Sequence, residues 1–488
     1  MTAALVAALI IPLCGAVAVG PWRRSTRLPM LVACGAAALQ LIAVIAIPFG
    51  AGDGPMWHRL ELPWAPAIGL SFDLGVDGIS YPLIVLTSVL TLLCCAYTAA
   101  RPPGWGGPQL AALLLLVDFG ISGVFMATNL VLFFVFFEVV LLPMYAIIRG
   151  WGGADRAKAA TKFVLYTLLG SLLLLVGVLI VVAEAGSGDI VAIAQGRHRI
   201  PAETQLWAFI FLALGLAIKS PLWPLHTWLP DAHTQAPTVG SVMLAGVLLK
   251  LGTYGLIRVG VMLVPQGAKQ ASAVLAVLAV AAIIVGSLVC LAQTELKRLI
   301  AYSSVSHMGF VLLGIATMTP NGITAALYGS IAHGLITGLL FFLVGTIKDR
   351  TGTGELARLS GLRDTMPRLS GVLTFAALAS AGLPGLAGFW GEAFAIYAAF
   401  ERGGTLWVSL AVVAAVAAVL SAVYLLRMIR EVTTGEPSAA ARITDSGPAS
   451  RDVLVWAPMS AAIVVLGLAP WLLAHTIANS QLGWGMLL

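Results

Sequence analysis

Long apolar runs follow one another along almost the whole chain, and short polar connections separate them. A run of about 20 apolar residues is long enough to cross the ~30 Å hydrocarbon core of a bilayer as an α-helix. By this criterion we predict fourteen transmembrane helices, at 2–20, 29–49, 78–99, 109–127, 130–149, 160–184, 206–228, 236–262, 271–293, 299–318, 322–347, 369–400, 405–427 and 453–474. The longest connections, 50–77, 185–205, 348–368 and 428–452, are too short for a soluble domain, so we read them all as loops.

The composition agrees with an all-α polytopic membrane protein. Of 488 residues, 60% are hydrophobic and only 10% are charged, whereas about 25% of the residues of a soluble protein are charged. The cysteines all lie in apolar runs, without a CxxC or Cys/His cluster, at positions 14, 34, 94, 95 and 290. We therefore expect neither a metal site nor an iron–sulfur cluster in this chain.

Lysine and arginine alternate along the predicted topology. The odd-numbered connections, which include Lys297, carry 19 of these 27 residues, and the even-numbered ones, which include Arg258, carry 6. The remaining two are Lys219 and Lys250. By the positive-inside rule the odd connections are cytoplasmic and both termini are outside. The net charge of +6 is thus a topology signal and not a sign of nucleic-acid binding.

The segment from Lys219 to Lys250 concentrates groups that hydrocarbon rejects. Pro221, Pro224 and Pro230 interrupt any helix that enters it. A lysine at the centre of a bilayer costs about 2.5–3.5 kcal/mol on insertion scales, so it normally faces an interior path or a partner. Irregular backbone at that depth likewise needs surrounding protein or water. We expect the function to lie here.

Other ionisable residues lie inside predicted helices: Asp118, Glu138 and Glu392 among the acids, and His226, His233, His307 and His333 among the histidines. If Glu138 and Lys219 face each other, their proton affinities depend on their separation. Lys250, His307, His333 and Glu392 would continue such a chain, because histidine titrates near neutral pH and bridging waters can link the groups.

Each of these residues also has a purely structural interpretation. Glu138 and Lys219 are then a static pair that fixes helix packing. His226 and His233 then cap carbonyls freed by the broken helix, and Asp118 bonds a neighbouring hydroxyl. On this view the whole chain is a membrane scaffold.

Two predicted helices are interrupted at corresponding places, five helices apart. The seventh breaks at Pro221 and Pro224, and the twelfth breaks at Pro384–Gly385, near Glu392. Interrupted helices in corresponding positions indicate inverted repeats. We predict two inverted five-helix repeats, helices 4–8 and 9–13. The chain then divides into 1–108 (helices 1–3), 109–262 (first repeat), 263–430 (second repeat) and 431–488 (a cytoplasmic loop and helix 14).

Three segments resemble the antiporter-like subunits of respiratory complex I and their relatives in cation/proton antiporters and membrane-bound hydrogenases. The most specific is KSPLWPLHTWLPDAHTQAPTVGSVMLAGVLLK, which begins at Lys219. FFVFFEVVLLPMY and ELKRLIAYSSVSHMG support it. The resemblance implies fourteen helices with the seventh and twelfth broken, and proton translocation driven by redox chemistry in other subunits.

Matching motifs imply roles for particular residues. Glu138 resembles the acid of the fifth helix, Lys219 the proton-carrying lysine of the seventh, and Lys250 the connecting lysine of the eighth. His307 and His333 resemble polar residues of the second half, and Glu392 resembles the exit residue of the twelfth helix. A lysine is usual there in L-type and N-type subunits, whereas a glutamate marks the M type.

The resemblance also implies the surroundings of the chain. It implies no cofactor in the chain itself, with FMN, iron–sulfur clusters and quinone in partner subunits. L-type and N-type subunits are expected on either side in a hetero-oligomer within a bacterial inner membrane. The alternative is a subunit of a multisubunit cation/proton antiporter or of a membrane-bound hydrogenase. In either machine the isolated chain catalyses no redox reaction.

Overall fold

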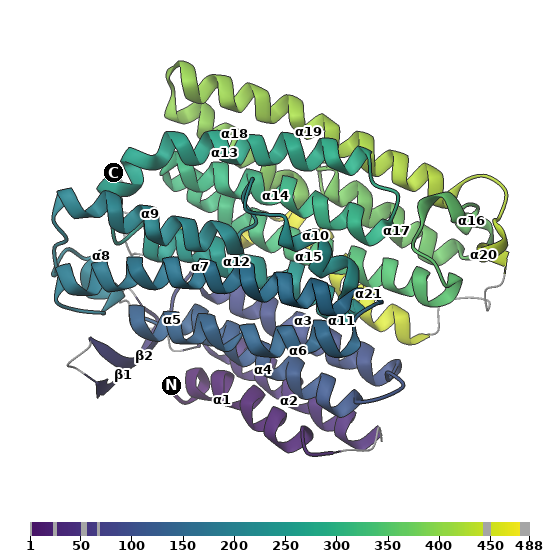
Figure 1. Cartoon of the computed structure of the whole chain (residues 1–488), viewed down its shortest axis with the longest axis horizontal. Helices are drawn as coiled ribbons and strands as arrows, with labels where there is room; N and C mark the ends of the chain where they lie inside the picture. Colours follow the sequence, from purple (N-terminus) through teal and green to yellow (C-terminus); the bar gives the residue numbers. More distant parts are fainter. Residues whose placement is uncertain (1, 23–26, 50–55, 66–68, 443–449, 479–488) are drawn as a thin grey trace.

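The computed structural model of the chain describes residues 2–22, 27–49, 56–65, 69–442 and 450–478. Long helices run side by side, with α1 and α2 at one edge of the bundle and α19 at the opposite edge (Figure 1). The elements are α1 (Thr2–Val19), α2 (Arg27–Ala46), β1 (His58–Ala65), β2 (Leu70–Val76), α3 (Tyr81–Ala100), α4 (Gly107–Met126), α5 (Leu130–Val139), α6 (Leu141–Trp151), α7 (Arg156–Ala185), α8 (Ile190–Ala194), α9 (Ala202–Lys219), α10 (Trp228–Gln235), α11 (Thr238–Met243), η2 (Leu244–Leu248), α12 (Leu249–Gly255), η3 (Leu256–Val261), α13 (Pro265–Leu291), α14 (Leu296–Thr317), α15 (Pro320–Thr351), η4 (Leu356–Arg358), α16 (Leu362–Thr365), α17 (Pro367–Ser380), α18 (Ala387–Arg402), α19 (Gly404–Thr433), α20 (Ala439–Arg442), α21 (Ser450–Leu468) and α22 (Trp471–Ala478).

Twelve helices in the described part of the chain are long and apolar enough to cross a membrane, and a bent pair, α21 and α22, raises the number to 13. The remaining predicted span, 369–400, is divided into α17 and α18, of 14 and 16 residues. Each is shorter than the hydrocarbon core requires for a single crossing. The chain is thus a polytopic helical membrane protein, and the number fourteen stays a prediction.

A β-hairpin corrects the interpretation of 50–77 as loop. Strands β1 and β2 pair antiparallel at one end of the bundle (Figure 1). Arg59 of β1 forms an ion pair of 2.9 Å with Asp189, which caps α8, and Asn129 donates a hydrogen bond to the Gly69 carbonyl. A scan for apolar runs misses such short amphipathic strands, because their period is two residues.

The last predicted span, 453–474, is also bent, by 78° between α21 and α22. Side chains from neighbouring helices donate hydrogen bonds to the carbonyls near the bend. Tyr328 donates to the Leu466 carbonyl at 2.5 Å, and Trp390 donates to the Gly467 carbonyl at 2.8 Å. The break is tolerated because protein surrounds its backbone groups.

Burial separates interior helices from peripheral ones. Residues 238–261 and the spanning part of α15 are completely buried, whereas α19 exposes much of its surface, including Val416 and Val419. Exposed aliphatic side chains suit contact with lipid. Lys250 and His333 of the predicted path therefore lie on the two most enclosed segments.

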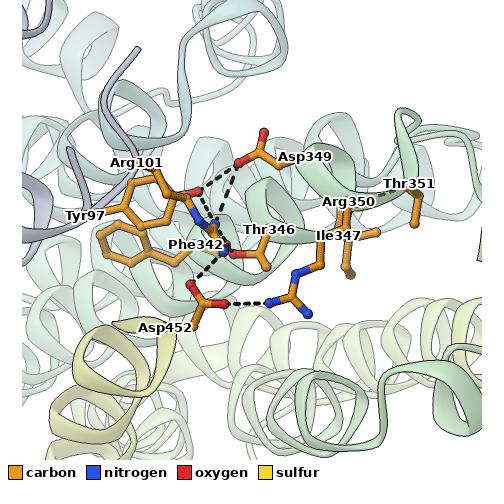
Figure 2. A network of polar contacts seen from close by, with 9 residues as sticks. All are labelled: Tyr97, Arg101, Phe342, Thr346, Ile347, Asp349, Arg350, Thr351 and Asp452. Atoms are coloured by element: carbon orange, nitrogen blue, oxygen red, sulfur yellow. Dashed lines mark hydrogen bonds and ion pairs between the residues drawn. The ribbon is translucent and has the colours of Figure 1, made fainter. Parts of the chain in front are cut away.

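An ionic cluster holds α21 against α3 and α15 (Figure 2). The buried carboxylate of Asp452 lies between two guanidinium groups, 2.6 Å from Arg101 and 2.7 Å from Arg350. Arg101 also donates to the Tyr97 hydroxyl at 2.8 Å. Charge-assisted hydrogen bonds of this length are stronger than neutral ones, so this cluster fixes the first turn of α21.

Replacing Asp452 with Ala is expected to loosen α21. The change removes the shared acceptor of two arginines, and hydrogen bonds to charged groups are worth about 1.5–3 kcal/mol each. We expect a lower thermal-unfolding midpoint of the purified protein. Glu436→Ala, at an exposed position, is the control. Equal midpoints for the two variants would contradict a stabilising role of the cluster.

Candidate functional site

The predicted break in the seventh span begins directly after Lys219, where α9 ends, and α10 resumes at Trp228. Interior side chains satisfy the carbonyls that the break leaves free. The Trp228 indole donates to the Ile218 carbonyl at 3.0 Å, and the Ser220 hydroxyl donates to the Leu216 carbonyl at 2.8 Å. Lys219 is therefore the last residue of a helix that ends inside the protein, where it is buried from solvent.

Asp231 fixes the short helix α10 that follows the break. Its carboxylate lies 2.7 Å from Lys162 of α7 and 3.4 Å from Arg298 of α14. Lys162, which the sequence places in a cytoplasmic connection, therefore has a specific partner. The contacts tie the broken segment to one helix of each predicted repeat.

Glu138 and Lys219 lie in the same region but form no ion pair in the described structure. Lys219 is 2% exposed, and its ammonium group lies 4.8 Å from the centre of the Phe137 ring. The Glu138 charge acts on Lys219 electrostatically from beyond contact distance. Direct pairing, as assumed from the sequence, is thus absent from this conformation. A role of the two residues in proton transfer stays a prediction.

Lys250 contacts a histidine, although no acid partner was evident in its own span. It follows the π-helical turn η2 and is fully buried. Its ammonium group donates to the Ala245 carbonyl and lies 2.7 Å from Nδ1 of His333 on α15. An ammonium group only donates hydrogen bonds, so His333 accepts at Nδ1 and carries its own hydrogen on Nε2.

Glycines allow this contact between η2 and α15. A Cβ atom on Gly334, next to His333, would lie 2.6 Å from the Gly246 carbonyl oxygen. A Cβ atom on Gly246 would lie 2.4 Å from a methyl group of Leu90. The approach at Gly334 is to backbone and is too close for any larger residue, whereas the Leu90 side chain could move away from a residue at 246. Small residues here bring the π turn within hydrogen-bond reach of α15.

His307 of α14 joins Glu392 of α18. Nδ1 of His307 lies 2.8 Å from the Glu392 carboxylate, and Nε2 lies 3.0 Å from the Ser380 hydroxyl. A carboxylate accepts hydrogen bonds, so Nδ1 donates to Glu392, while Nε2 pairs with the Ser380 hydroxyl. Ser380 is the last residue of α17, at the predicted interruption of the twelfth span. It was not predicted from the sequence, because a lone serine carries no distinguishing signal.

The interruption itself shapes the Glu392 site. Gly382 and Gly385, between α17 and α18, have φ angles of +75° and +91°. This left-handed region favours glycine. A Cβ atom on Gly382 would lie only 3.2 Å from the Glu392 carboxylate. The break thereby lets backbone approach the acid closely.

A small cavity separates the two contact pairs. It has a volume of about 30 Å³ and is lined by His307, His333, Thr337, Ser380 and Glu392, among others. The two imidazole rings are 6.0 Å apart, which is too far for a hydrogen bond. A water needs about 10–15 Å³ of such space, so the cavity has room for roughly two. Nε2 of His333 has no protein partner and is free to donate to a water there.

His233 does not cap a freed carbonyl, contrary to the structural interpretation. It is fully buried, and neither ring nitrogen has a protein partner. The ring stacks on Phe341 with a centroid distance of 4.7 Å. Its neighbours Lys250 and Lys297 both act on it electrostatically. The carbonyl-capping role in this segment belongs to Trp228 instead.

His226 lies apart from this group. Its ring meets the Tyr302 ring edge-on with a centroid distance of 6.2 Å, and Nδ1 has no protein partner. No contact with Lys219, Lys250 or the other histidines links it to the site in the described residues. We therefore find no geometric support for His226 in a relay.

Two residues that the charge count assigned to loops are buried instead. Lys297 begins α14 at 4% exposure and donates to the Ala236 carbonyl at 2.9 Å. Arg258, within η3, forms a 2.6 Å ion pair with Asp77. Counting charges by hydropathy places such residues outside the membrane, because a boundary residue of a span looks like a loop residue. Their burial is possible because each charged group contacts a polar partner that is distant in sequence.

The structure thus brings together Lys250, His333, His307 and Glu392, and His233 has both Lys250 and Lys297 as electrostatic neighbours. Contacts, electrostatic neighbours and the cavity connect these residues in that order. Glu138 and Lys219 form a separate pair. The described residues contain no group of three or more His, Cys, Asp or Glu side chains placed to hold a metal ion.

Comparisons with known proteins agree on one family. Residues 127–420 match the family described as NADH:quinone oxidoreductase/Mrp antiporter, TM. NADH-quinone oxidoreductase subunit M of Rickettsia bellii is 40% identical over 446 residues, which cover 90% of this chain and 89% of that protein.

Solved structures show the same fold. A chain of respiratory complex I from Thermus thermophilus superimposes with a TM-score of 0.89 at 30% identity and covers 98% of both chains. A chain of the Mrp complex from Dietzia superimposes with a TM-score of 0.85 at 25% identity, over 99% of this chain and 97% of that one.

Proposed function

Because the chain belongs to the NADH:quinone oxidoreductase/Mrp antiporter family of membrane subunits, we propose that it is a proton-translocating subunit of a respiratory NADH:quinone oxidoreductase. Two hydrogen-bonded pairs, Lys250–His333 and His307–Glu392, with a cavity between them, are the observation that carries this proposal. A scaffold needs buried charges paired, but it does not need a hydratable cavity between two such pairs.

The buried contacts suggest how a proton crosses the second half of the chain. The Lys250 ammonium group gives a proton to Nδ1 of His333, and His333 releases the hydrogen on Nε2 to a water in the cavity. That water passes a proton to the Glu392 carboxylate, which His307 holds in place, and Ser380 in turn holds the His307 ring. Each transfer joins a donor and an acceptor within hydrogen-bond reach or through one water.

The first half supplies the proton to Lys250. Glu138 and Lys219 hold opposite charges near each other, and their proton affinities change when their separation changes. His233 has Lys250 and Lys297 as electrostatic neighbours, so His233 and Lys297 offer a second route from the N-terminal end of α14. The two inverted repeats, 109–262 and 263–430, provide one half-path each. The flanking segments 1–108 and 431–488 support them.

The chain works as a part of a larger assembly. Neighbouring L-type and N-type subunits flank it in a bacterial inner membrane, with both termini on the outer side. FMN, iron–sulfur clusters and quinone belong to partner subunits, and the isolated chain oxidises no NADH. Detectable NADH oxidation by the purified chain would contradict this part of the proposal.

Replacing Glu392 with Gln tests the proposed path. Gln keeps a hydrogen bond to His307 but cannot take up a proton. A positioned acid–base group typically contributes 10²–10⁴-fold, so we expect proton pumping to fall roughly tenfold or more. Pumping is measured by acidification inside inverted membrane vesicles, driven by NADH, with assembly checked by the amount of intact complex.

The matched control is Glu401→Gln, because Glu401 ends the same helix at an exposed position and bonds Asn321. Equal pumping by the two variants would contradict the role of Glu392. The same vesicles distinguish an NADH:quinone oxidoreductase subunit from a cation/proton antiporter subunit. Sodium/proton exchange without NADH, with no NADH-driven pumping even in the unmodified protein, would favour a cation/proton antiporter subunit.

A further inference from the structure

A buried acid outside the proposed path lies between α2 and α4. Asp118 of α4 and Gln40 of α2 are both completely buried. Oδ1 of Asp118 accepts hydrogen bonds from the Gln40 amide and from the Ser122 hydroxyl, both at 2.9 Å. We call these three residues the α2–α4 cluster. The sequence suggested only a bond between Asp118 and a neighbouring hydroxyl.

Two oxygens of the α2–α4 cluster are buried without a protein hydrogen-bond donor. These atoms are Oδ2 of Asp118 and Oε1 of Gln40. The hydroxyl of Thr91, on α3, points its donor toward the Asp118 carboxyl group but does not reach hydrogen-bond distance of Oδ2. Buried polar atoms are nearly always hydrogen-bonded. The cluster thus has more hydrogen-bond acceptors than donors, and one more proton would supply a donor.

No positive charge compensates Asp118 in the part of the chain that the structure describes. The ionisable group that interacts electrostatically with Asp118 is a thiol, that of Cys95 on α3. Elements packed against α4 carry other ionisable residues that form neither an ion pair nor a hydrogen bond with Asp118: Cys14 of α1, Asp73 of β2, Glu138 of α5, Arg149 of α6 and Lys250 of α12. A thiol offers no countercharge.

Asp77 shows the contrast within the same protein. It is as deeply buried as Asp118, but Arg258 lies 2.6 Å away and compensates its charge. An isolated carboxylate in a low-dielectric interior is so costly that the group neutralises instead. Asp77 is compensated by an arginine. Asp118 has no such partner among the described residues, so protonation is the way in which its charge can be removed.

We propose that Asp118 is a proton-binding site separate from the Lys250–Glu392 path, and that it is a neutral carboxylic acid at neutral pH. The proton resides on Oδ2, the carboxyl oxygen that has no protein hydrogen-bond partner. Oδ1 keeps its two donors. The cluster then carries no net charge.

The site borders the path without belonging to it. The Thr91 hydroxyl also lies 4.0 Å from the sulfur of Met243, the residue that directly precedes η2. Thr91 therefore lies between Asp118 and the residue that precedes the π turn η2, and Lys250 follows that turn. The proposal does not depend on the proposed function, because it concerns a single protonation state.

Infrared spectroscopy of the purified, assembled protein at pH 7 tests this assignment. A carboxylic acid and a carboxylate have separate C–O stretching bands. We expect the difference spectrum between wild type and Asp118→Asn to show loss of one carboxylic-acid band. We also expect Ser122→Ala to shift that band, because the hydroxyl no longer donates to the carbonyl oxygen. This second variant retains the acid, so the test survives a failure of Asp118→Asn to assemble.

Each other result overturns the assignment. Loss of carboxylate bands in Asp118→Asn would show a charged group. Carboxylate bands that move when sodium is replaced by potassium would show that a metal cation, not a proton, occupies the cluster. An unshifted acid band in Ser122→Ala would place the acid elsewhere. Glu138→Gln, measured in parallel, controls for bands from the path, and a loss of pumping in that variant would not bear on Asp118.

Discussion

Replacing Lys250 with Met is expected to abolish NADH-driven proton pumping while the complex still assembles. Methionine fills a similar volume with an apolar, flexible side chain. It has no proton to give to His333, whose Nδ1 lies 2.7 Å from the lysine ammonium group. Removing a buried charge relieves its desolvation cost, which offsets the loss of the two hydrogen bonds that the ammonium group donates. We expect pumping to fall by roughly a hundredfold or more, since a positioned acid–base group contributes at least that much.

The measurement is acidification of inverted vesicles per NADH oxidised, together with the amount of intact complex. Lys269→Met is the matched control, because Lys269 is exposed in the first turn of α13. A scaffold role predicts a different pattern, in which assembly and pumping fall in proportion. Full pumping by the Lys250→Met protein would show that protons do not pass through Lys250, and it would contradict the proposed path from Lys250 to Glu392.

The second large effect concerns stability. Arg258 and Asp77 have side chains exposed by only 2% and 1%, and their charged atoms are 2.6 Å apart. Arg258 also donates to the Tyr254 hydroxyl at 3.3 Å. Arg258→Met takes the countercharge away from the Asp77 carboxylate inside the protein. Breaking a buried pair in this way costs about 3–5 kcal/mol, so most of the protein is expected to misassemble.

The yield of folded protein and its thermal-unfolding midpoint measure this loss. Arg199→Met changes an exposed arginine and is the control. The double variant Asp77→Asn with Arg258→Met should recover much of the loss, because the amide is neutral and still accepts the backbone hydrogen bonds that Asp77 receives from Ile79 and Ser80. A double variant as unstable as Arg258→Met alone would show that charge compensation is not the role of the pair.

The sequence predicted the interrupted helices well. The breaks after Lys219 and after Ser380 lie where Pro221 and Pro384–Gly385 indicated them. Proline lacks a backbone donor and clashes with the preceding turn, so its effect is local and visible in sequence. The bend between α21 and α22 escaped notice, because its carbonyls are satisfied by Tyr328 and Trp390, which are distant in sequence.

Pairing of buried charges was predicted less well. Glu138 and Lys219 make no direct pair, whereas Asp77 and Arg258 do, and Arg258 had been assigned to a loop. The residues Asp77 and Arg258 are 181 positions apart. Periodicity and spacing report on neighbours along a helix, and they carry no information about which helices adjoin.

By itself the sequence determined that the chain is a polytopic helical membrane protein, which family it resembles and which ionisable residues lie within hydrocarbon. Those properties follow from the apolar content of each segment and from local motifs. Only the tertiary structure decided that Lys250 meets His333, that a cavity with room for water separates His333 from His307, and that Asp118 has no countercharge among the described residues. The physical reason is that proton transfer and charge burial depend on contacts within a few ångströms, and packing between distant segments creates those contacts.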